Sequence, residues 1–290
     1  MGYALDIERV TKRYKAFTLN EVSLQLPRGY IMGLIGPNGA GKTTLIKLIL
    51  NLVRRDGGAI RVFGLDTLAD EAAIKSRIGF VPDEPRFHDD ATLASVASAV
   101  APYYANWDPK RFATLAGEFE LPLKKNFKKL SHGTKTKFAL ALALSHGAEL
   151  VLLDEPTTGL DPVFRRRLLD MLAGLLEDER TSVLFSTHIT ADLERTADFV
   201  TFVKDGHVIF SNPMDQVTES WAVVKGGRDT LDADALAFLE GVRIRAHGFE
   251  GLTSRAEEAR RRFGNGYVIE RAALDDIMVL FGKEGSDDDE

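Results

Sequence analysis

The first thirty residues of the chain alternate apolar and polar side chains. Residues 5–10 and 19–26 follow this alternation, which is the period of a β-strand with one face exposed. Fully apolar runs then recur at 150–153, 182–185 and 199–203, with helical patterns between them. Short apolar strands separated by helices are typical of a buried, mostly parallel sheet. The pattern therefore predicts an α/β core beside an antiparallel β subdomain.

The stretch between these two sections, residues 84–147, lacks strand patterns. Its apolar spacing predicts helices over 92–104, 109–119 and 137–145, which we interpret as an inserted helical subdomain. Farther on, Asp205-Gly206 stands between two apolar runs. A dipeptide of this type predicts the turn of a β-hairpin, and we expect that hairpin to close the core.

Shorter helical and extended patterns alternate beyond residue 215. They predict helices over 232–241, 254–263 and 274–281, and extended segments over 242–246 and 267–269. We therefore divide the chain into a domain at 1–215 and a small α+β appendage at 216–282. Residues 283–290 are acidic and have no apolar anchor, so we expect a disordered tail there.

Composition narrows the class of protein. With 290 residues, of which 44% are hydrophobic, the chain can bury a large core. It has no cysteine, which excludes structural disulfides and thiolate metal sites and agrees with a reducing compartment. The net charge of −6 argues against binding to nucleic acid. No apolar run reaches the roughly 18 residues that a membrane span needs, and we expect a cytoplasmic protein.

The run from Gly36 to Thr44 carries the strongest chemical signal. It fits the phosphate-loop pattern G-x-x-x-x-G-K-[ST] and lies between an apolar strand at 30–35 and a helical run at 45–50. Its glycines let successive N–H groups turn toward an anion at the start of the helix. The residues expected to bind ATP here are Gly36, Asn38, Gly39, Ala40, Gly41, Lys42, Thr43 and Thr44. Lys42 would reach the β- and γ-phosphates, and the hydroxyl of Thr43 would bind Mg²⁺.

Two adjacent carboxylates follow the buried strand at 150–153. Alternation along a strand points the side chains of Asp154 and Glu155 in different directions, so each can have its own task. We assign Asp154 to Mg²⁺, through the water shell of the ion, and Glu155 to polarising the attacking water. A surface turn with two acids before Pro156 is the alternative.

The order of further motifs makes residues 3–215 resemble the ATP-binding-cassette (ABC) ATPases. Leu130-Ser-His-Gly-Thr134 stands where that family has its LSGGQ signature, ahead of the carboxylate pair. Thr158-Gly-Leu-Asp161 resembles the family's D-loop, Ser186-Thr-His188 its switch histidine, and Tyr14 the aromatic residue that stacks on adenine. The resemblance implies a P-loop NTPase core in which His188 contacts the γ-phosphate and holds water and Glu155 in line. Phe17 is an alternative to Tyr14 for stacking.

The same resemblance implies that one chain holds only part of a catalytic site. In the family, the signature of one subunit closes over the ATP held by the other, so Ser131, His132, Gly133 and Thr134 would act in trans. The positive end of the helix predicted at 135–145 suits a γ-phosphate. Read locally, however, Ser131 is also an ordinary helix N-cap.

Two positions depart from the family pattern. Asp83 stands where the family usually has the Q-loop glutamine, so it would contact the metal as an anion, and His132 and Thr134 replace the glycine and glutamine of LSGGQ. Like charge from Asp83 beside Asp154 and Glu155 predicts a site that depends more strongly on Mg²⁺. These departures, with the segment 103–123, are similar to the Ytr-type branch of bacterial exporter-type subunits.

The function implied is therefore the ATP-hydrolysing subunit of a bacterial ABC transporter. The expected partners are a second copy or a homologous ATPase subunit, and permease subunits that hold the protein at the inner face of the cell membrane. Aromatic side chains at 83–107 would dock a membrane subunit, or would simply pack inside the helical subdomain. These side chains belong to Phe87, Tyr103, Tyr104 and Trp107.

Two other functions stay open from the residues. A non-transport ABC ATPase, acting as a DNA-repair clamp or as a regulatory or assembly factor, is one of them. Fewer than ninety residues separate Lys42 from Ser131, and they carry no heptad pattern for the long coiled coil that repair proteins have there. A nucleotide-binding regulator with little turnover is the other, and the presence of both Glu155 and His188 argues against it.

Overall fold

The computed structural model describes residues 2–177, 180–264 and 266–282, so the tail predicted at 283–290 lies outside the described residues. Spatial contacts divide the chain into two units. The first comprises Met1–His188 and Thr201–Ser211, and the second Ile189–Val200 together with the chain from Asn212 onward. The domain boundary after residue 215 stays a prediction, because a division by contacts does not show which segments fold independently.

An antiparallel sheet opens the first unit. Its strands are β1 (Tyr3–Arg13), β2 (Thr18–Pro27), β4 (Gly57–Val62) and β5 (Leu65–Asp66), in the order β2-β1-β4-β5. Leu5 faces Leu26 and Ile7 faces Leu24 across β1 and β2, and these side chains are buried. The apolar positions of the alternating pattern thus form one face of this sheet, as the sequence predicts.

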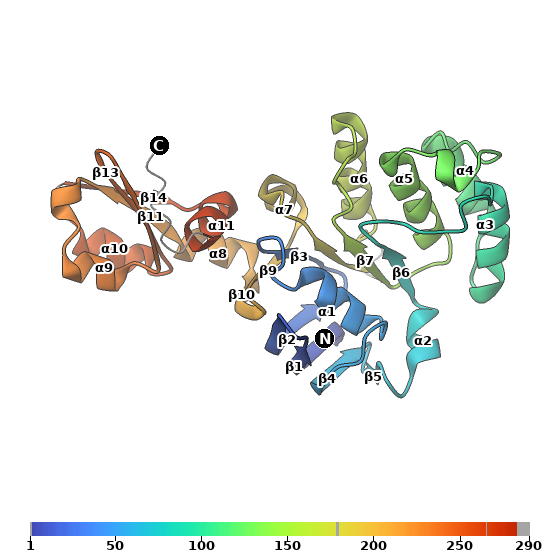
Figure 1. The fold of residues 1–290 in the computed structure, drawn as a ribbon, viewed down its shortest axis with the longest axis horizontal. Helices are drawn as coiled ribbons and strands as arrows, with labels where there is room; N and C mark the ends of the chain where they lie inside the picture. Colours follow the sequence, from blue (N-terminus) through green and yellow to red (C-terminus); the bar gives the residue numbers. More distant parts are fainter. Residues whose placement is uncertain (1, 178–179, 265, 283–290) are drawn as a thin grey trace. The chain divides into compact units, whose positions relative to one another are not determined.

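A six-stranded sheet forms the centre of the first unit (Figure 1). Its strands, in spatial order, are β10 (His207–Pro213), β9 (Phe199–Lys204), β3 (Ile31–Ile35), β8 (Ser182–Ser186), β7 (Leu150–Asp154) and β6 (Ile78–Val81). From β3 to β6 every neighbouring pair is parallel. All residues of β3, β7 and β8 are buried, which explains their uninterrupted apolar runs. The predicted parallel core is confirmed.

The register of this sheet brings distant segments to one edge. Asp154 lies opposite Ser186, Leu34 lies opposite the same serine, and Val81 lies opposite Leu153. The carboxyl ends of parallel strands meet at one side of a sheet, and that side is where ligands of such folds bind. The phosphate loop, the carboxylate pair and Asp83 all follow these ends.

Helices follow or separate these strands. They are α1 (Lys42–Ile49) after β3, α2 (Glu71–Lys75), α3 (Leu93–Val100), α4 (Pro109–Glu118), α5 (His132–Ala143), α6 (Pro162–Gly174) and α7 (Thr190–Thr196), with short 3₁₀ turns at Ala101–Tyr103 and Phe127–Lys129. The helix predicted to begin at residue 135 begins at His132, because Ser131 caps it by accepting a hydrogen bond from the N–H of Thr134 at 3.3 Å. It ends at Ala143, two residues before the predicted end.

The second unit contains a four-stranded antiparallel sheet in the order β12-β13-β11-β14. Its elements from residue 214 are α8 (Met214–Ser220), β11 (Ala222–Gly226), a 3₁₀ turn (Arg228–Thr230), α9 (Ala233–Phe238), β12 (Gly241–Arg245), β13 (Gly248–Thr253), α10 (Ala256–Arg262), β14 (Tyr267–Arg271) and α11 (Leu274–Gly282). From β11 to β14 the order β-α-β-β-α-β is that of a split βαβ motif. Phe238, Phe249 and Phe263 pack in its core. The predicted α+β character is confirmed. Within the described ranges, no helix is both long and apolar enough to cross a bilayer.

Candidate functional site

Two glycines of the phosphate loop lie where both the backbone angle and the surrounding space exclude a side chain. Gly36 has φ 152°, and a Cβ atom there would lie 2.0 Å from the carbonyl oxygen of Val203. Gly41 has φ 112°, and a Cβ atom there would lie 2.8 Å from Leu19 and 2.9 Å from the ring of Phe17. Both positions would force the surrounding structure to move if they carried a side chain. The loop is therefore held tightly between the two sheets of the first unit.

Lys42, the first residue of α1, is 6% exposed. Its Nζ donates to the carbonyl oxygens of Gly36 at 2.7 Å and Pro37 at 3.2 Å, and lies 3.7 Å from Oε1 of Glu155. Burial lowers the pKa of Lys42, while the carboxylates of Glu155 and Asp154 oppose that effect. The ammonium group is thus held beside the loop among acceptors that stabilise its charge.

Thr43 and Asp154 form the pair of oxygen donors expected for a magnesium ion. The hydroxyl of Thr43 donates to Oδ1 of Asp154 at 3.1 Å, although the two residues are 111 positions apart in the chain. Mg²⁺ is usually held by one or two protein oxygens together with substrate phosphates and water. Among the described residues, no group of three or more histidine, cysteine or acidic side chains could hold a metal ion by itself. The donor set fits an ion that binds together with a nucleotide.

Glu155 lies between two cationic or proton-donating groups. Its Oε2 atom accepts from Nδ1 of His188 at 2.8 Å, and its Oε1 atom faces Lys42. The backbone of Glu155 has φ 49°, a left-handed conformation that is uncommon for a residue with a side chain. Strain of this kind occurs at functional sites where surrounding contacts hold it. The predicted water-polarising carboxylate and the predicted switch histidine are therefore in direct contact.

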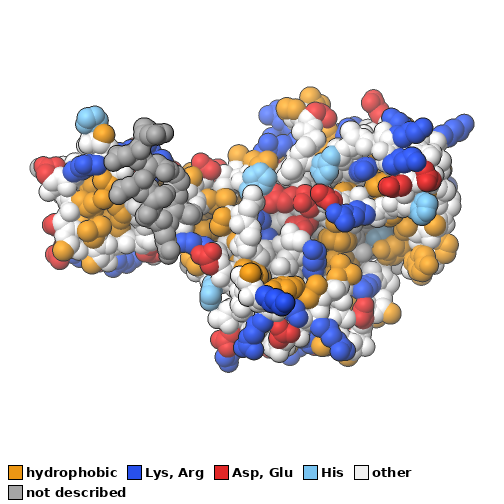
Figure 2. Space-filling view, in the orientation of Figure 1, with side chains coloured by type: hydrophobic (Ala, Val, Ile, Leu, Met, Phe, Trp, Pro, Cys, Tyr) orange, Lys and Arg blue, Asp and Glu red, His pale blue; other side chains and the backbone are white. Residues whose placement is uncertain are grey.

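Asp83 follows β6 at the same edge of the sheet. Asp83 keeps an exposed surface, but partial desolvation raises its pKa, the negative charges of Asp154 and Glu155 raise it further, and His132 opposes the shift. The like-charge repulsion expected from the sequence is thus present. Figure 2 shows a group of acidic side chains on this unit, with histidine side chains at its margins.

The signature residues 131–134 lie beside the D-loop, whose Thr158 donates to Oε2 of Glu155 at 3.5 Å. Ser131 caps α5, and its Oγ atom lies 2.8 Å from the hydroxyl oxygen of Thr134. A Cβ atom on Gly159 would lie 2.9 Å from the His132 ring, and one on Gly133 would lie 3.1 Å from the Gly159 carbonyl oxygen. In the described part of the chain, no hydrogen bond or ion pair joins residues 130–134 to the phosphate loop.

Asp161 ends the D-loop as the N-cap of α6. Its carboxylate accepts from the N–H of Phe164 at 2.9 Å, and this hydrogen bond holds the pKa of Asp161 below its ordinary value. Lys137 of α5 lies 3.9 Å from the same carboxylate. The D-loop is therefore tied to the helix that carries the signature.

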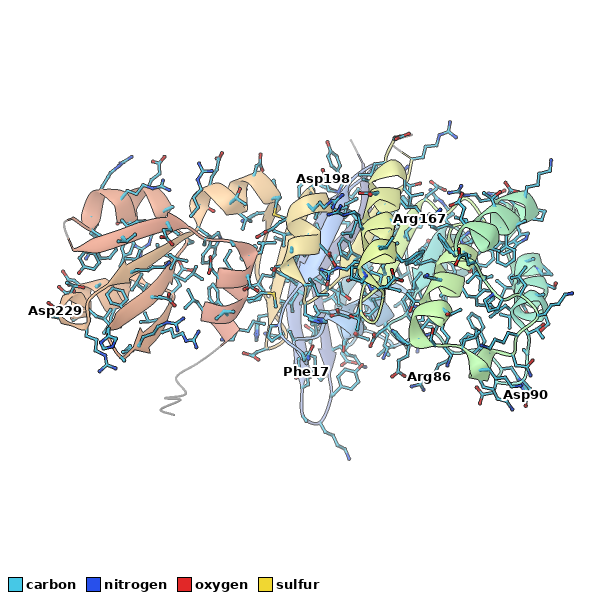
Figure 3. The ribbon with its side chains drawn as sticks, turned by 90° about the horizontal axis from the view of Figure 1, so that it is seen from above. Phe17, Arg86, Asp90, Arg167, Asp198 and Asp229 are labelled. Atoms are coloured by element: carbon cyan, nitrogen blue, oxygen red, sulfur yellow. The ribbon has the colours of Figure 1, made fainter. Side chains whose placement is uncertain are left out.

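Tyr14 and Phe17 lie on the turn between β1 and β2. Tyr14 is 43% exposed, and Lys12 Nζ lies 5.7 Å from the centre of its ring. Phe17, labelled in Figure 3, contacts the phosphate loop at Gly41. Phe17 is thus placed beside the residue that precedes α1, where a base could stack on it, and no described contact places Tyr14 there.

Ser186 opens the Ser186-Thr-His188 motif, but the motif alone predicts no role of its own for this serine. It lies at the end of β8, fully buried, and its hydroxyl contacts both Asp154 and the backbone of Glu155. The only signal in the sequence is its position two residues before His188.

The parallel sheet, the phosphate loop and the paired carboxylates define a P-loop nucleoside triphosphatase. Residues 19–158 match the family model described as "ABC transporter". The chain is 30% identical over 212 residues to "ABC transporter ATP-binding protein YtrB" of Bacillus subtilis (strain 168), a match that covers 73% of this chain and 72% of that protein. It is 31% identical over 217 residues to "Bacitracin transport ATP-binding protein BcrA" of Enterococcus faecalis, covering 72% and 69%.

Solved structures agree with these relatives. One described as "Structure of ATP binding subunit of ABC transporter" superposes with a TM-score of 0.69 at 28% identity, over 74% of this chain and 92% of that one. The chain belongs to the ABC transporter family, as an ATP-binding subunit with ATPase activity. The family, the fold class and the activity that its motifs predict are confirmed.

Proposed function

We propose that two copies of this chain close around two Mg·ATP, hydrolyse them, and drive a pair of separately encoded permease subunits of an exporter. The observation that carries this proposal is the separation of two phosphate-binding regions on one unit. Lys42, Thr43, Asp154, Glu155 and His188 form one contiguous cluster. Ser131 and His132 of the signature are exposed, and among the described residues no hydrogen bond or ion pair joins residues 131–134 to that cluster. A second copy supplies the missing region.

The residues of the first cluster have complementary roles in hydrolysis. Lys42 and the loop amides bind the phosphates, and Thr43 with Asp154 would hold the magnesium ion, which neutralises phosphate charge when bound. Glu155 accepts the proton of the attacking water. Because Oε2 of Glu155 is an acceptor, Nδ1 of His188 carries the proton in this contact. His188 thereby keeps the carboxylate oriented.

Asp83 replaces a neutral residue and adds a third negative charge near the metal. Partial desolvation and the charges of Asp154 and Glu155 raise the pKa of Asp83, so its ionised form is held at a cost that a bound cation relieves. We infer that this chain requires Mg²⁺ more strongly than a cassette with glutamine there.

The surface for the membrane subunit is narrower than the aromatic face expected from the sequence. Phe87 packs on Phe127 at a centroid distance of 5.3 Å. Trp107 packs on Phe112 at 5.5 Å. Tyr104 stacks on His146 at 3.9 Å. These three rings are half-buried, whereas Tyr103 is 83% exposed and offers the most surface for an anchor among the four.

The transport role rests on the relatives as well as on the site. The relative from Enterococcus faecalis is named for bacitracin transport. We infer transport out of the cell and a position at the inner face of the membrane, through the permease subunits. The non-transport alternatives have no observation in their favour.

Replacement of Glu155 by glutamine tests this function. Glu155→Gln keeps the shape of the side chain and removes its basicity, so ATP binding persists while turnover falls by about a hundredfold or more. The ATP-bound dimer should also last longer, because product formation no longer opens it. Turnover at the wild-type rate would remove the role of Glu155. Glu219→Gln, which makes the same change at an exposed glutamate of α8, is the control.

A further inference from the structure

The buried hydroxyl of Ser186 joins the two acidic residues of the site. Ser186 is the last residue of β8 and has no exposed surface. Its Oγ atom donates to Oδ1 of Asp154 at 2.6 Å and accepts the backbone N–H of Glu155 at 3.0 Å. The carbonyl oxygen of Ser186 accepts the same N–H at 3.1 Å. We propose that Ser186 is a positioning residue for hydrolysis, which fixes the Asp154 carboxylate and the backbone of Glu155 together. The proposal rests on the roles given to these acids above.

The contact with Asp154 fixes which carboxylate oxygen is available. A serine hydroxyl has one proton, and here that proton goes to Oδ1 of Asp154. The hydroxyl of Thr43 donates to the same atom. An ionised carboxylate has two oxygens that can both accept, so these two donors occupy Oδ1 and leave Oδ2 for the water shell of a metal ion. Thr43 in turn keeps its lone pairs for that ion.

The contact with Glu155 supports a strained turn. The φ angle of 49° at Glu155 is sparsely populated for residues other than glycine. Two oxygens of Ser186 share the N–H of Glu155, which holds the chain as it leaves β7. This turn places the carboxylate of Glu155 between Lys42 and His188. A loosened turn would move the carboxylate away from both.

Ser182 is a second buried serine of β8, and it does not contact Asp154 or Glu155. It is the first residue of β8, it has no exposed surface, and its Oγ atom accepts the N–H of Gly29 at 2.9 Å. Burial, strand and the acceptance of a backbone N–H therefore match those of Ser186, whereas the hydrogen bond to a carboxylate is made by Ser186. Ser182 lies at the opposite end of the strand from the carboxylates. Ser182→Ala thus reports the cost of losing a buried hydroxyl from β8, and nothing more.

The test compares Ser186→Ala with Ser182→Ala in the full chain. For Ser186→Ala we expect kcat to fall by about a hundredfold while KM for ATP changes by less than about threefold. ATP affinity measured with EDTA present should stay within about twofold of wild type, because the phosphate loop is intact. The Mg²⁺ concentration for half-maximal rate should rise. Ser182→Ala should lower Tm by a similar amount and leave kcat unchanged.

Two further measurements separate positioning from structure. Ser186→Thr keeps the hydroxyl and should restore most of kcat, whatever its effect on Tm. In a Glu155→Gln background, Ser186→Ala should lower the residual rate by less than about threefold, because both changes disable the same group. A kcat within about twofold of wild type for Ser186→Ala overturns the inference. The inference is also overturned if Ser186→Ala lowers kcat, the ATP affinity measured with EDTA and Tm together, because that result indicates general damage to the fold.

Failure of this inference is distinguishable from failure of the proposed function. If Glu155→Gln abolishes turnover and Ser186→Ala does not, only the role of Ser186 is wrong. If Glu155→Gln retains turnover, the assignment of Glu155 is wrong, and the inference about Ser186 falls with it.

Discussion

The phosphate-loop region and the signature region of the first unit differ in how far their polar groups already have hydrogen-bond partners. In the phosphate-loop region, Lys42 is buried and held by two carbonyl oxygens and Glu155. In the signature region, Ser131 is exposed, and within the described ranges its hydroxyl bonds to Thr134 in the first turn of the helix that it caps. A preorganised charged cluster suits catalysis, because it costs no reorganisation during the reaction. The exposed helix end is suited to a ligand that arrives from outside.

Substitutions in the two regions should therefore affect different steps, namely ATP binding in one region and hydrolysis in the other. Under the proposed function, damage to the phosphate-loop region would remove groups that bind the nucleotide of the same chain. Damage to the signature region would leave that binding intact and block a step that needs a second copy. The variants below separate these two outcomes.

Lys42→Ala should have the largest effect. Loss of the ammonium group removes charge-assisted hydrogen bonds to phosphate, and we expect ATP affinity to fall by about a hundredfold and turnover to become undetectable. Isothermal titration with ATP and a phosphate-release assay measure the two effects. Lys47→Ala, on the exposed side of the same helix, is the control and should change neither.

Ser131→Arg should separate binding from turnover. An arginine at the exposed head of α5 blocks closure against a second copy, so we expect hydrolysis to drop by about a hundredfold while the ATP affinity of the single chain is unchanged. The substitution also removes an N-cap, which costs about 1 kcal/mol of stability. Thr92→Arg removes the N-cap of α3 and controls for that loss. Weak ATP binding by Ser131→Arg alone would break the comparison.

Asp83→Gln should change the metal requirement more than the rate. Removal of one negative charge next to Asp154 and Glu155 lessens the repulsion that Mg²⁺ relieves. We expect hydrolysis to stay measurable and the Mg²⁺ concentration for half-maximal rate to fall. Titration of activity with Mg²⁺ at saturating ATP measures this effect. An unchanged titration curve contradicts our view of Asp83.

The smallest expected effect is a change in how the stability of the fold depends on pH, and it comes from His146. His146 is 1% exposed, stacks on Tyr104, and has no hydrogen-bond partner for either ring nitrogen among the described residues. Burial lowers the pKa of His146 from its ordinary 6.5. The unfolded chain therefore binds this proton more readily, and stability should fall as the pH drops below 6.5 toward the lowered pKa. His146→Phe keeps an aromatic ring and should flatten that dependence in thermal melts recorded at several pH values.

Much of the core was predictable because its strands are buried on both faces. Such strands are uninterrupted apolar runs, which can be identified in the sequence without knowing which strands they pair with. Two strands that were missed, β4 and β13, contain glycine where a neighbour approaches closely. A Cβ atom on Gly58 would lie 2.3 Å from the carbonyl oxygen of Arg9, and one on Gly251 would lie 2.4 Å from Leu239. Glycine is rare in strands, and only the fold reveals these approaches.

The site was predictable where one short segment carries its chemistry, as the phosphate loop does. Ser186 was not predictable, because its role depends on the pairing of β7 with β8 and on the register that sets it opposite Asp154. Register is specified by the whole sheet and not by a local pattern. The aromatic residues show the same limit, since spacing could not tell the exposed Tyr103 from the stacked Tyr104.

Cross-linking between the two regions tests most directly that each is half of one site. The chain has no cysteine, so Asn38→Cys and Thr134→Cys can be introduced together, in the Glu155→Gln background, and joined with a short bis-maleimide. The account predicts a covalent dimer that forms only when ATP is present. A cross-link within one chain, or no dimer at saturating ATP, would contradict it.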